Sequence, residues 1–388
     1  MTSRSIRLLA SGLVFASAWT CLALGGTQAA ADAAPKRGDD GVPGRFNAIT
    51  DVPGILVGQV QSTEPPYLTG STVVYTPDEP VAGVDVRGGS PGTWMTDMLS
   101  PSNANPGTDA IVLTGGSVWG MDVGVGAMHW LEDHRNIDIP IVPGAVIWDI
   151  GRGGDETARP TADWGYRAMD AAKDGPVRQG TVGAGTGAVT GNGTLKGGVG
   201  TASVELDDGT VVGALVVVNA LGSTVNPKDC TLYGAELGLG DEFAGLRKPS
   251  PAECRPLEGT APNRNTTIAV VATSASMENA AATRMAAAAQ DGLARAMNPA
   301  HTLYDGDTVF GVATGTGRKL ANNDPDDTPA LARIGAAAAD TLSRAVAHAM
   351  LAATSARQYE SYCDTYPSAC ANLRRHRAGR GAPDTGRS

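Results

Sequence analysis

The sequence predicts a mixed α/β or α+β domain in which helices lie outside apolar sheets. Three observations support this fold class. Of 388 residues, 42% are hydrophobic and 18% are charged, so the chain can bury a large core. Short runs rich in β-branched residues alternate with segments of helical spacing. Thr210–Asn219 is almost continuously apolar, as expected of a strand that is covered on both faces.

The individual elements follow from these patterns. Strands are predicted at Ile55–Val60, Ser71–Thr76, Ala110–Leu113, Ile139–Val142, Thr210–Asn219, Thr266–Thr273 and Thr308–Ala313. Helices are predicted at Ser117–Glu132, Thr161–Ala172, Met277–Met297 and Thr328–Ala356. Asp327 or Thr328 caps the last helix, with Pro329 just inside its start.

Two long segments lack such patterns. Nine of the 21 residues from Gly180 to Gly200 are glycine, which indicates tight turns and close approach of the backbone to a neighbour. Thr224–Arg264 is polar and rich in proline, with little periodicity. A loop of this length inside a compact domain is usually functional or disordered.

The first 33 residues resemble a secretory signal peptide. A positively charged start is followed by an apolar stretch and then by small residues that fit cleavage after Ala31 or Ala33. A membrane anchor is the alternative. Because no later apolar stretch approaches roughly 18 residues, we expect the mature protein to be soluble and secreted.

The mature chain is expected to form one domain. Residues 34–45 are a polar linker and residues 46–370 are the single domain. Residues 374–388, which are rich in arginine and glycine, are expected to form a disordered tail.

Four cysteines remain after removal of the signal peptide: Cys230, Cys254, Cys363 and Cys370. An even number in an exported chain indicates two disulfides, for which three pairings exist. Proximity in sequence favours Cys230–Cys254 and Cys363–Cys370. Four reduced structural cysteines are the alternative. A zinc site is disfavoured, because there is no Cys-x-x-Cys pair and no histidine near either pair.

Charge and motifs exclude several classes of function. With 30 Lys+Arg against 40 Asp+Glu, the formal charge is −10, whereas a nucleic-acid-binding surface needs a basic stripe. Ser117 does not lie in a Gly-x-Ser-x-Gly motif, and the five histidines have no metal-ligand spacing. Asp305-Gly306-Asp307 lacks the later ligands of a calcium loop. We therefore expect no nucleic-acid partner, no metal and no organic cofactor.

Thr266 is the remaining candidate for chemistry. It opens a buried strand directly after the long irregular loop. In an intact chain it is an ordinary strand residue. If the chain is cut before it, the new N-terminal threonine carries a nucleophile and a base in one residue. Its α-amine has a pKa of roughly 7.7–8.0 and can take the proton of the hydroxyl.

Several sequence blocks, which together span essentially the whole mature chain, carry a family resemblance. They are Ile-Thr-Asp-Val-Pro-Gly at 49–54, Val-Asp-Val-Arg-Gly-Gly-Ser-Pro-Gly at 84–92, Leu-Thr-Gly-Gly-Ser at 113–117, Lys-Gly-Gly-Val-Gly-Thr-Ala-Ser at 196–203 and Val-Val-Asn-Ala at 217–220. This combination resembles the self-processing L-aminopeptidase/D-esterase family, which includes beta-peptidyl aminopeptidases and nylon-oligomer hydrolase. The resemblance implies an α+β fold, a four-layer α/β/β/α sandwich of the N-terminal-nucleophile type.

The resemblance also implies the site. The chain would cut itself at Asn265–Thr266 into an α chain (34–265) and a β chain (266–388), which assemble into a homo-oligomer. Aminopeptidase members mostly cut before a serine that follows glycine, whereas the Asn-Thr junction and the Asp-Gly-Asp motif look like the nylon-oligomer hydrolase branch. By motif matching, Thr266 is the catalytic nucleophile, and its catalytic partners are Lys196, Asn219, Asp305 and Asp307.

The residues themselves suggest physical roles. Asn219 ends an apolar strand, where its amide can donate to an oxyanion. Lys196 can approach the threonine hydroxyl from the glycine-rich stretch and depress the pKa of the amine. On a strand, Asp305 and Asp307 would share a face and could orient the Thr266 amine or a substrate ammonium. A surface lysine, a turn-forming asparagine and two solvated carboxylates are the alternatives.

Two further residues are candidates for substrate binding. Ser117 is expected to start a helix, where its side chain caps the first turn or the nearby N–H groups support substrate. Trp119 either lines the pocket or packs in the core.

The substrate remains open between two classes. One is short peptides or β-amino amides, cut by an aminopeptidase. The other is ω-amino oligoamides, cut internally. A rival from outside the enzymes is a secreted, uncut binding protein whose glycine-rich loops hold a ligand.

Overall fold

The fold is that of a computed structural model, which describes residues 41–105, 107–257, 259 and 264–379. The chain divides into two units, Met1–Asp39 and Asp40–Ser388, and the second unit contains every described residue. The expected signal peptide and the first part of the expected linker lie outside these ranges. Among the helices of the described part, none combines the length and the apolar character that crossing a membrane requires.

Two five-stranded sheets form the centre of the second unit. One has the order β1-β2-β5-β6-β4 and the other β3-β12-β11-β10-β9. The strands of the first are β1 (Leu56–Ser62), β2 (Thr69–Tyr75), β5 (Ala110–Thr114), β6 (Gly144–Val146) and β4 (Thr93–Trp94). Those of the second are β3 (Val81–Val86), β12 (Thr308–Ala313), β11 (Thr266–Thr273), β10 (Val211–Asn219) and β9 (Gly198–Glu205). A short hairpin joins β7 (Val189–Thr190) to β8 (Leu195–Lys196).

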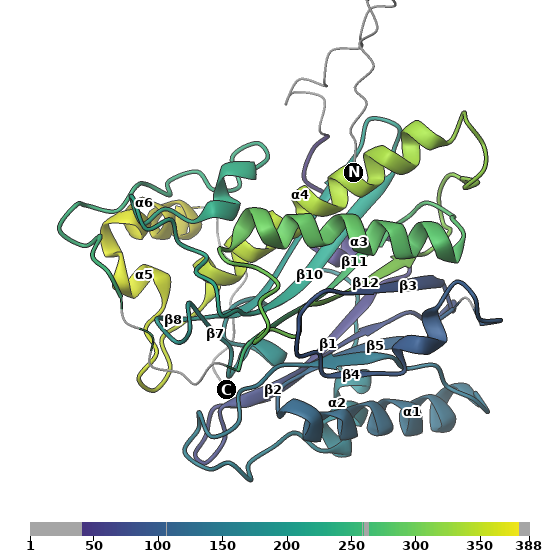
Figure 1. The fold of residues 1–388 in the computed structure, drawn as a ribbon, viewed down its shortest axis with the longest axis horizontal. Coiled ribbons are helices and arrows are strands. Elements are labelled where there is room, and N and C mark those ends of the chain that lie inside the picture. Colours follow the sequence, from purple (N-terminus) through teal and green to yellow (C-terminus); the bar gives the residue numbers. More distant parts are fainter. Residues whose placement is uncertain (1–40, 106, 258, 260–263, 380–388) are drawn as a thin grey trace, which may run out of the picture. The chain divides into compact units, whose positions relative to one another are not determined.

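Helices cover the outer face of each sheet (Figure 1). α1 (Asp122–Arg135) and α2 (Ala162–Asp170) cover the first sheet, while α3 (Asn279–Ala296) and α4 (Thr328–Ala352) cover the second. Two shorter helices, α5 (Tyr362–Thr365) and α6 (Pro367–Gly379), follow at the carboxyl end. The resulting order of layers is helix, sheet, sheet, helix, which confirms the predicted four-layer sandwich.

Alternation along the strands explains the layers. Along β11, Ile268 and Val270 belong to the core between the sheets, whereas Ala269 and Val271 belong to the core beneath α3 and α4. Both faces of this strand are therefore apolar and buried. A Cβ at Gly200 in β9 would lie 1.9 Å from the carbonyl oxygen of Ala345, so a glycine is needed for α4 to pack this closely on the sheet.

Most predicted elements are confirmed, but the strand expected at Ile139–Val142 is wrong. Strand β6 begins only at Gly144. Pro140 lies inside the expected segment and Pro143 follows it directly, and a proline cannot donate the N–H that a sheet ladder requires.

Three details of the predicted ends also differ. Asp327 precedes α4, but its carboxylate binds Arg318 and the N–H of Ala321 instead of capping the helix. The expected linker reaches the sheet, because Val42 pairs with Glu205. Helix α6 runs to Gly379, so residues 374–379, which were expected to be disordered, are helical. The rest of the expected tail lies outside the described residues.

The buried Arg344 side chain joins α4 to three distant segments. The Arg344 guanidinium donates to the carboxylate of Glu242 at 2.8 Å and 2.5 Å, to the side-chain oxygen of Asn47 at 2.8 Å and to the carbonyl of Ser203 at 3.0 Å. Burial alone would raise the pKa of Glu242, but the hydrogen bonds and charges of Arg344 and His348 outweigh it and lower that pKa to about 2.

Glu242 should therefore make the protein sensitive to acid. The folded-state pKa of Glu242 lies below the ordinary 4.5. Ionised Glu242 therefore adds about 3 kcal/mol to the free energy of unfolding above pH 4.5, and this contribution is lost as the pH falls toward 2. In Glu242→Gln, Tm should be lower at pH 7 and should fall less steeply below pH 4.5 than in the wild type. Glu132→Gln, on the exposed face of α1, is the control. Parallel curves of Tm against pH for Glu242→Gln and wild type would contradict this role.

Candidate active site

Thr266 and Asn219 face each other across two neighbouring strands. Thr266 is the first residue of β11, Asn219 is the last of β10, and the antiparallel register pairs them directly. Opposed residues in such a pair project to the same face. By alternation from Val217 and Ile268, that face is the one between the two sheets. Both side chains are buried.

The Thr266 hydroxyl lies against the peptide bond that precedes it. Its Oγ1 donates to the carbonyl oxygen of Asn265. Gly306 lies beside the Thr266 hydroxyl oxygen. A Cβ at position 306 would be 3.0 Å from Thr266 Oγ1 and 2.6 Å from the carbonyl oxygen of Ser90. A glycine in the Asp-Gly-Asp motif therefore leaves room for the hydroxyl.

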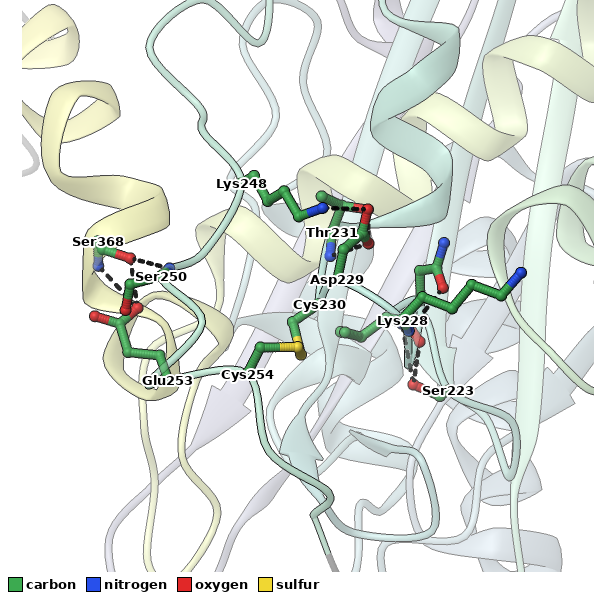
Figure 2. Close-up of a disulfide and its surroundings, with 12 residues drawn as sticks. Ser223, Lys228, Asp229, Cys230, Thr231, Lys248, Ser250, Glu253, Cys254 and Ser368 are labelled. Atoms are coloured by element: carbon green, nitrogen blue, oxygen red, sulfur yellow. Dashed lines mark hydrogen bonds and ion pairs between the residues drawn. A yellow bond between two sulfur atoms is a disulfide. The ribbon is translucent and has the colours of Figure 1, made fainter.

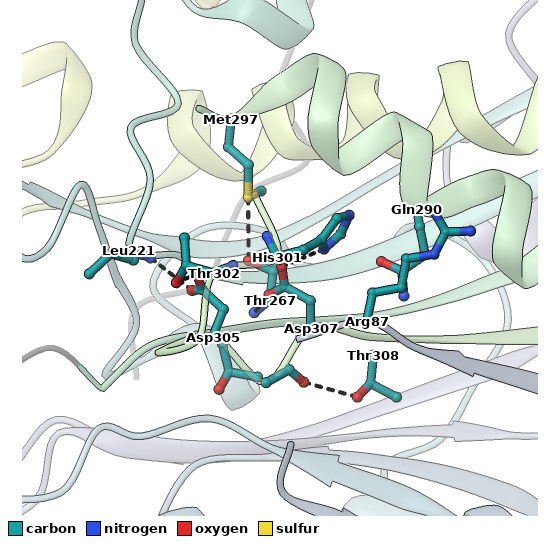
Figure 3. Close-up of polar contacts among 12 residues, drawn as sticks. Arg87, Leu221, Thr267, Gln290, Met297, His301, Thr302, Asp305, Asp307 and Thr308 are labelled. Carbon is teal, nitrogen blue, oxygen red and sulfur yellow. Dashed lines mark hydrogen bonds and ion pairs between the residues drawn. The ribbon is translucent and has the colours of Figure 1, made fainter. Parts of the chain in front are cut away.

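Asp307 anchors the start of β11. One carboxylate oxygen accepts the N–H of Thr267 at 2.7 Å, and the other accepts from His301, through Nδ1 at 2.8 Å and the backbone N–H at 3.0 Å (Figure 3). Burial opposes the charged imidazole, but the hydrogen bond and charge of Asp307 outweigh it and raise the pKa of His301. Asp307 thus connects Thr267 to a histidine from the loop after α3.

Asp305 links the loop before β12 to the residue that lies two positions after β10. Its carboxylate accepts from the N–H of Leu221 at 3.0 Å, just beyond β10, and from the N–H of Thr302 at 3.2 Å (Figure 3). Burial, and then the charge of Asp307, raises the pKa of Asp305. The two aspartates were expected to share a strand face. They lie instead in the turn before β12, because that strand begins only at Thr308.

Lys196 is fully buried in the glycine-rich segment. Its ammonium donates to the carbonyls of Gly185, Ala188 and Gly197 at 2.8, 2.7 and 2.9 Å. Three carbonyls match the three N–H groups of an ammonium. Burial, and then the charge of Arg152, lowers the pKa of Lys196 well below its ordinary value. Among the described residues, its ammonium makes no hydrogen bond to Thr266, so its effect on the threonine would be electrostatic.

Ser117 and Trp119 lie at the start of the helix that follows β5. Ser117 begins a 3-10 helix, η3 (Ser117–Met121), and its N–H donates to the carbonyl of Ile147. The expected cap is wrong, because the N-cap is Gly116 and makes no side-chain hydrogen bond. Trp119 is 60% exposed beneath the Arg159 guanidinium, so it is not a core residue.

The two disulfides have the expected pairing. Cys230–Cys254 closes part of the long loop before Thr266, and Cys363–Cys370 joins α5 to α6. The two regions contact each other, since the hydroxyl of Tyr362 donates to the carbonyl of Cys230. Figure 2 shows Ser368 of α6 hydrogen-bonded to Glu253 beside the first disulfide. Within the described ranges, no cluster of three or more potential metal-ligating side chains occurs.

Comparison with known proteins identifies the family. The model of peptidase family S58 matches residues 47–362. The chain belongs to peptidase family S58. An uncharacterized aminopeptidase of Mycobacterium leprae (strain TN) is 46% identical over 351 residues, 84% of this chain and 95% of its own. A 6-aminohexanoate-oligomer endohydrolase of Paenarthrobacter ureafaciens is 31% identical over 281 residues, 68% of this chain and 74% of its own.

Solved structures agree on the fold. A Burkholderia sp. beta-aminopeptidase has a TM-score of 0.64 at 27% identity, covering 86% of this chain and 95% of its own. An L-aminopeptidase D-Ala-esterase/amidase of Ochrobactrum anthropi, described as a variant of the Ntn hydrolase fold, has a TM-score of 0.64 at 24% identity, with 87% and 96% covered. These likenesses confirm the family resemblance and the N-terminal-nucleophile-like fold. This S58 member is a peptide or amide hydrolase.

Two polar residues that contact the candidate site residues were missed by sequence reasoning. Arg152, which is 7% exposed, donates from Nη1 to the Asn219 side-chain oxygen at 2.5 Å. His301 binds Asp307 as described above. The histidines have no metal-ligand spacing, and Arg152 stands in a glycine-rich turn with no motif. Arg152 reaches Asn219 from a segment 67 positions away, whereas His301 is six positions from Asp307 and meets it through the irregular loop between them.

The contact between His301 and Asp307 should be visible in a histidine titration. We expect the pKa of His301 to lie above its ordinary 6.5 and to fall in Asp307→Asn, because the amide removes the charge that favours the imidazolium. NMR of the ring protons would measure this, with His301→Gln to assign the signal and His129, exposed on α1, as the internal control. An unchanged His301 pKa in Asp307→Asn would show that this carboxylate does not control the ring.

Proposed function

We propose that this S58 member is a secreted, self-processing amide hydrolase whose nucleophile is an N-terminal Thr266, made by cleavage at Asn265–Thr266. The observation that carries the proposal is the contact of the Thr266 hydroxyl with the Asn265 carbonyl, directly opposite Asn219. Secretion is supported by the signal-like residues 1–33 and by two disulfides.

Self-cleavage is an acyl transfer from nitrogen to oxygen. The Thr266 oxygen attacks the carbonyl carbon of Asn265, a C–O bond forms, and the C–N bond breaks. The hydroxyl proton passes to the departing nitrogen, which becomes the α-amine of Thr266. Water then hydrolyses the ester, releasing the Asn265 carboxyl group and restoring the hydroxyl.

Substrate hydrolysis repeats this chemistry on another amide. The Thr266 amine takes the hydroxyl proton, the oxygen attacks the substrate carbonyl, and the leaving amine receives a proton. Water then hydrolyses the acyl-enzyme ester. The α-amine titrates near pH 8 in a free chain, and the nearby cations Lys196 and Arg152 favour its neutral, basic form.

The surrounding residues divide the other tasks. Asn219 donates from its amide to the oxygen on which negative charge develops. Asp307 accepts a hydrogen bond from the N–H of Thr267 and so orients the neighbouring Thr266. Asp305, whose pKa is raised by burial, holds Leu221 and lies where a substrate ammonium could bind. Ser117 and Trp119 are proposed to contact substrate, and no metal or cofactor enters the chemistry.

Strand pairing would hold the two products together. The α chain (34–265) contributes β3 and β10, and the β chain (266–388) contributes β11 and β12. In the second sheet, β10 pairs with β11 and β3 with β12. Cleavage between these strands therefore leaves two intact ladders across the cut. Assembly of such units into a homo-oligomer remains a prediction from the family resemblance.

The comparisons and the motifs support two substrate classes. The M. leprae and Burkholderia proteins are named as aminopeptidases, which favours short peptides carrying a free amine. The Asn265–Thr266 junction and the Asp305-Gly306-Asp307 turn favour internal cleavage of ω-amino oligoamides, the activity in the name of the P. ureafaciens protein. We propose the first class as the main activity and the second as the alternative.

The proposed nucleophile can be tested by intact mass spectrometry. The wild-type protein should consist of two chains, one beginning at Thr266. Thr266→Ala should remain one chain and lose amide hydrolysis, because no hydroxyl is left to attack. Thr266→Ser keeps a hydroxyl and is the matched control that should still cleave.

The same experiment distinguishes the hydrolase from a secreted, uncut binding protein. Each disulfide lies on one side of Asn265–Thr266, so neither links the two product chains. The two chains should therefore be detected separately even without reductant, and reductant should only add the mass of two hydrogens per disulfide. A single wild-type chain of mature length, without covalent labelling at Thr266, would instead favour a secreted binding protein.

Blocking the substrate amine separates the two substrate classes. Aminoacyl nitroanilides and aminohexanoate oligomers should be compared with their N-acetylated forms. For an aminopeptidase, acetylation should abolish turnover, because the ammonium that the acidic site recognises is gone. Full activity on acetylated oligomers would overturn the aminopeptidase assignment and establish internal cleavage.

A further inference from the structure

The orientation of the Asn219 amide is decided by two donors. Its side-chain oxygen accepts from Arg152 Nη1 at 2.5 Å and from the N–H of Val189 at 3.1 Å. Its nitrogen has only a long contact, 3.5 Å, to the carbonyl oxygen of Trp148. An asparagine amide has an oxygen end and a nitrogen end of nearly equal shape, so its partners determine which end faces where.

A flipped amide would be unfavourable here. Its NH2 group would face the guanidinium and the N–H of Val189, so donors would meet donors in a buried place. Val189 alone supplies one neutral donor, whereas Arg152 adds a charge-assisted hydrogen bond. Arg152 therefore contributes the stronger constraint on the Asn219 amide.

Arg152 is held in place by the glycine-rich segment. The same Nη1 donates to the carbonyl of Gly187 at 2.7 Å, so its two hydrogens serve Gly187 and Asn219. The neighbouring carbonyls of Gly185 and Ala188 bind Lys196. This short stretch thus provides carbonyl oxygens for two buried cations beside the end of β10.

The placement of Arg152 is costly for the fold. The side chain is buried, which lowers the pKa of its guanidinium, and Nη2 has no hydrogen-bond partner among the described residues. The buried carboxylate of Asp149 and the nearby Tyr359 side chain favour the charged guanidinium, but burial outweighs them. A buried charge whose burial is not fully offset is more readily explained by the site than by stability.

We propose that Arg152 is a positioning residue that holds the Asn219 side chain with its NH2 group toward the carbonyl oxygen of the amide being cleaved. This inference rests on the proposed function, in which Thr266 is the nucleophile and Asn219 binds the oxyanion. The positive charge also polarises the Asn219 amide and strengthens its donor.

This role predicts that Arg152 affects the transition state more than substrate binding. Negative charge develops on the carbonyl oxygen only in the transition state, so loss of Arg152 should lower kcat and leave KM nearly unchanged. It should slow self-cleavage as well, because both reactions form an oxyanion beside Asn219. A merely structural arginine would affect stability without this selective loss of kcat.

The test uses the full-length protein and a double-mutant cycle. Arg152→Met, Asn219→Ala and the double variant are compared with wild type for self-cleavage by intact mass spectrometry and for kcat and KM on an aminoacyl nitroanilide. Arg152→Met should lose about 100-fold in kcat, as removal of an oxyanion donor does. The double variant should be about as slow as Asn219→Ala alone, because Arg152 acts through Asn219.

Controls separate this role from folding. Arg167→Met removes an exposed arginine from α2 and should behave as wild type. In Arg152→Ala, methylguanidinium should restore part of kcat, whereas in Asn219→Ala it should have no effect. If Arg152→Met does not fold, as judged by circular dichroism, Arg152→Lys carries the test and should keep KM but lower kcat.

Each outcome points to one conclusion. If wild type is cut at Thr266 but Arg152→Met has wild-type kcat, or if the losses of the two single variants multiply in the double variant, Arg152 does not position Asn219. A change in KM with kcat preserved would also overturn the inference. A wild-type protein that remains one chain would refute the proposed function itself, whatever the Arg152 variants do.

Discussion

The antiparallel register of β10 and β11 is the constraint on which the site depends. It pairs Asn219 with Thr266 at one end and Val212 with Thr273 at the other, with apolar side chains buried on both faces between them. A shift of one residue would move every side chain of β11 to the opposite face. Thr266 would then point toward the helices and away from Asn219. Burial of the apolar residues therefore also fixes the direction of the Thr266 side chain.

Buried charge is the second principle of the site. Lys196 and Arg152 take their hydrogen-bond acceptors mainly from backbone carbonyls of the glycine-rich segment. Asp305 accepts from the N–H of Leu221, just beyond β10, and Asp307 from the N–H of Thr267 near the start of β11. Cations and carboxylates that are themselves buried thus lie near the two strand ends. Electrostatic effects on an amine or an oxyanion are large in such surroundings.

Much of this could be predicted from local pattern. The strand from Thr266 to Thr273 has the predicted bounds, and the strand ending at Asn219 starts one residue later than expected. Both could be predicted because a short, continuous apolar run is typical of a strand that is buried on both faces. The segment at Ile139–Val142 looked similar, but a proline inside it and another directly after it disfavour a ladder. Asp305 and Asp307 stand out by their motif, yet they lie in the irregular segment before β12 and not on a strand. Trp119 was ambiguous, since a tryptophan in an amphipathic segment fits a core or an exposed position.

The sequence by itself determined the family, most of the layer-forming strands and helices and the disulfide pairs, because these depend on short-range pattern, spacing and motifs. Tertiary structure decided which polar groups meet. Arg152 reaches Asn219 across 67 positions of the chain. His301 is only six positions from Asp307, and the irregular loop between them brings the two side chains together. Such contacts leave no periodic or motif signal, since each is set by how the sheets, turns and glycine-rich segment pack. The nucleophile could thus be proposed from sequence, whereas the groups that orient its partners could not.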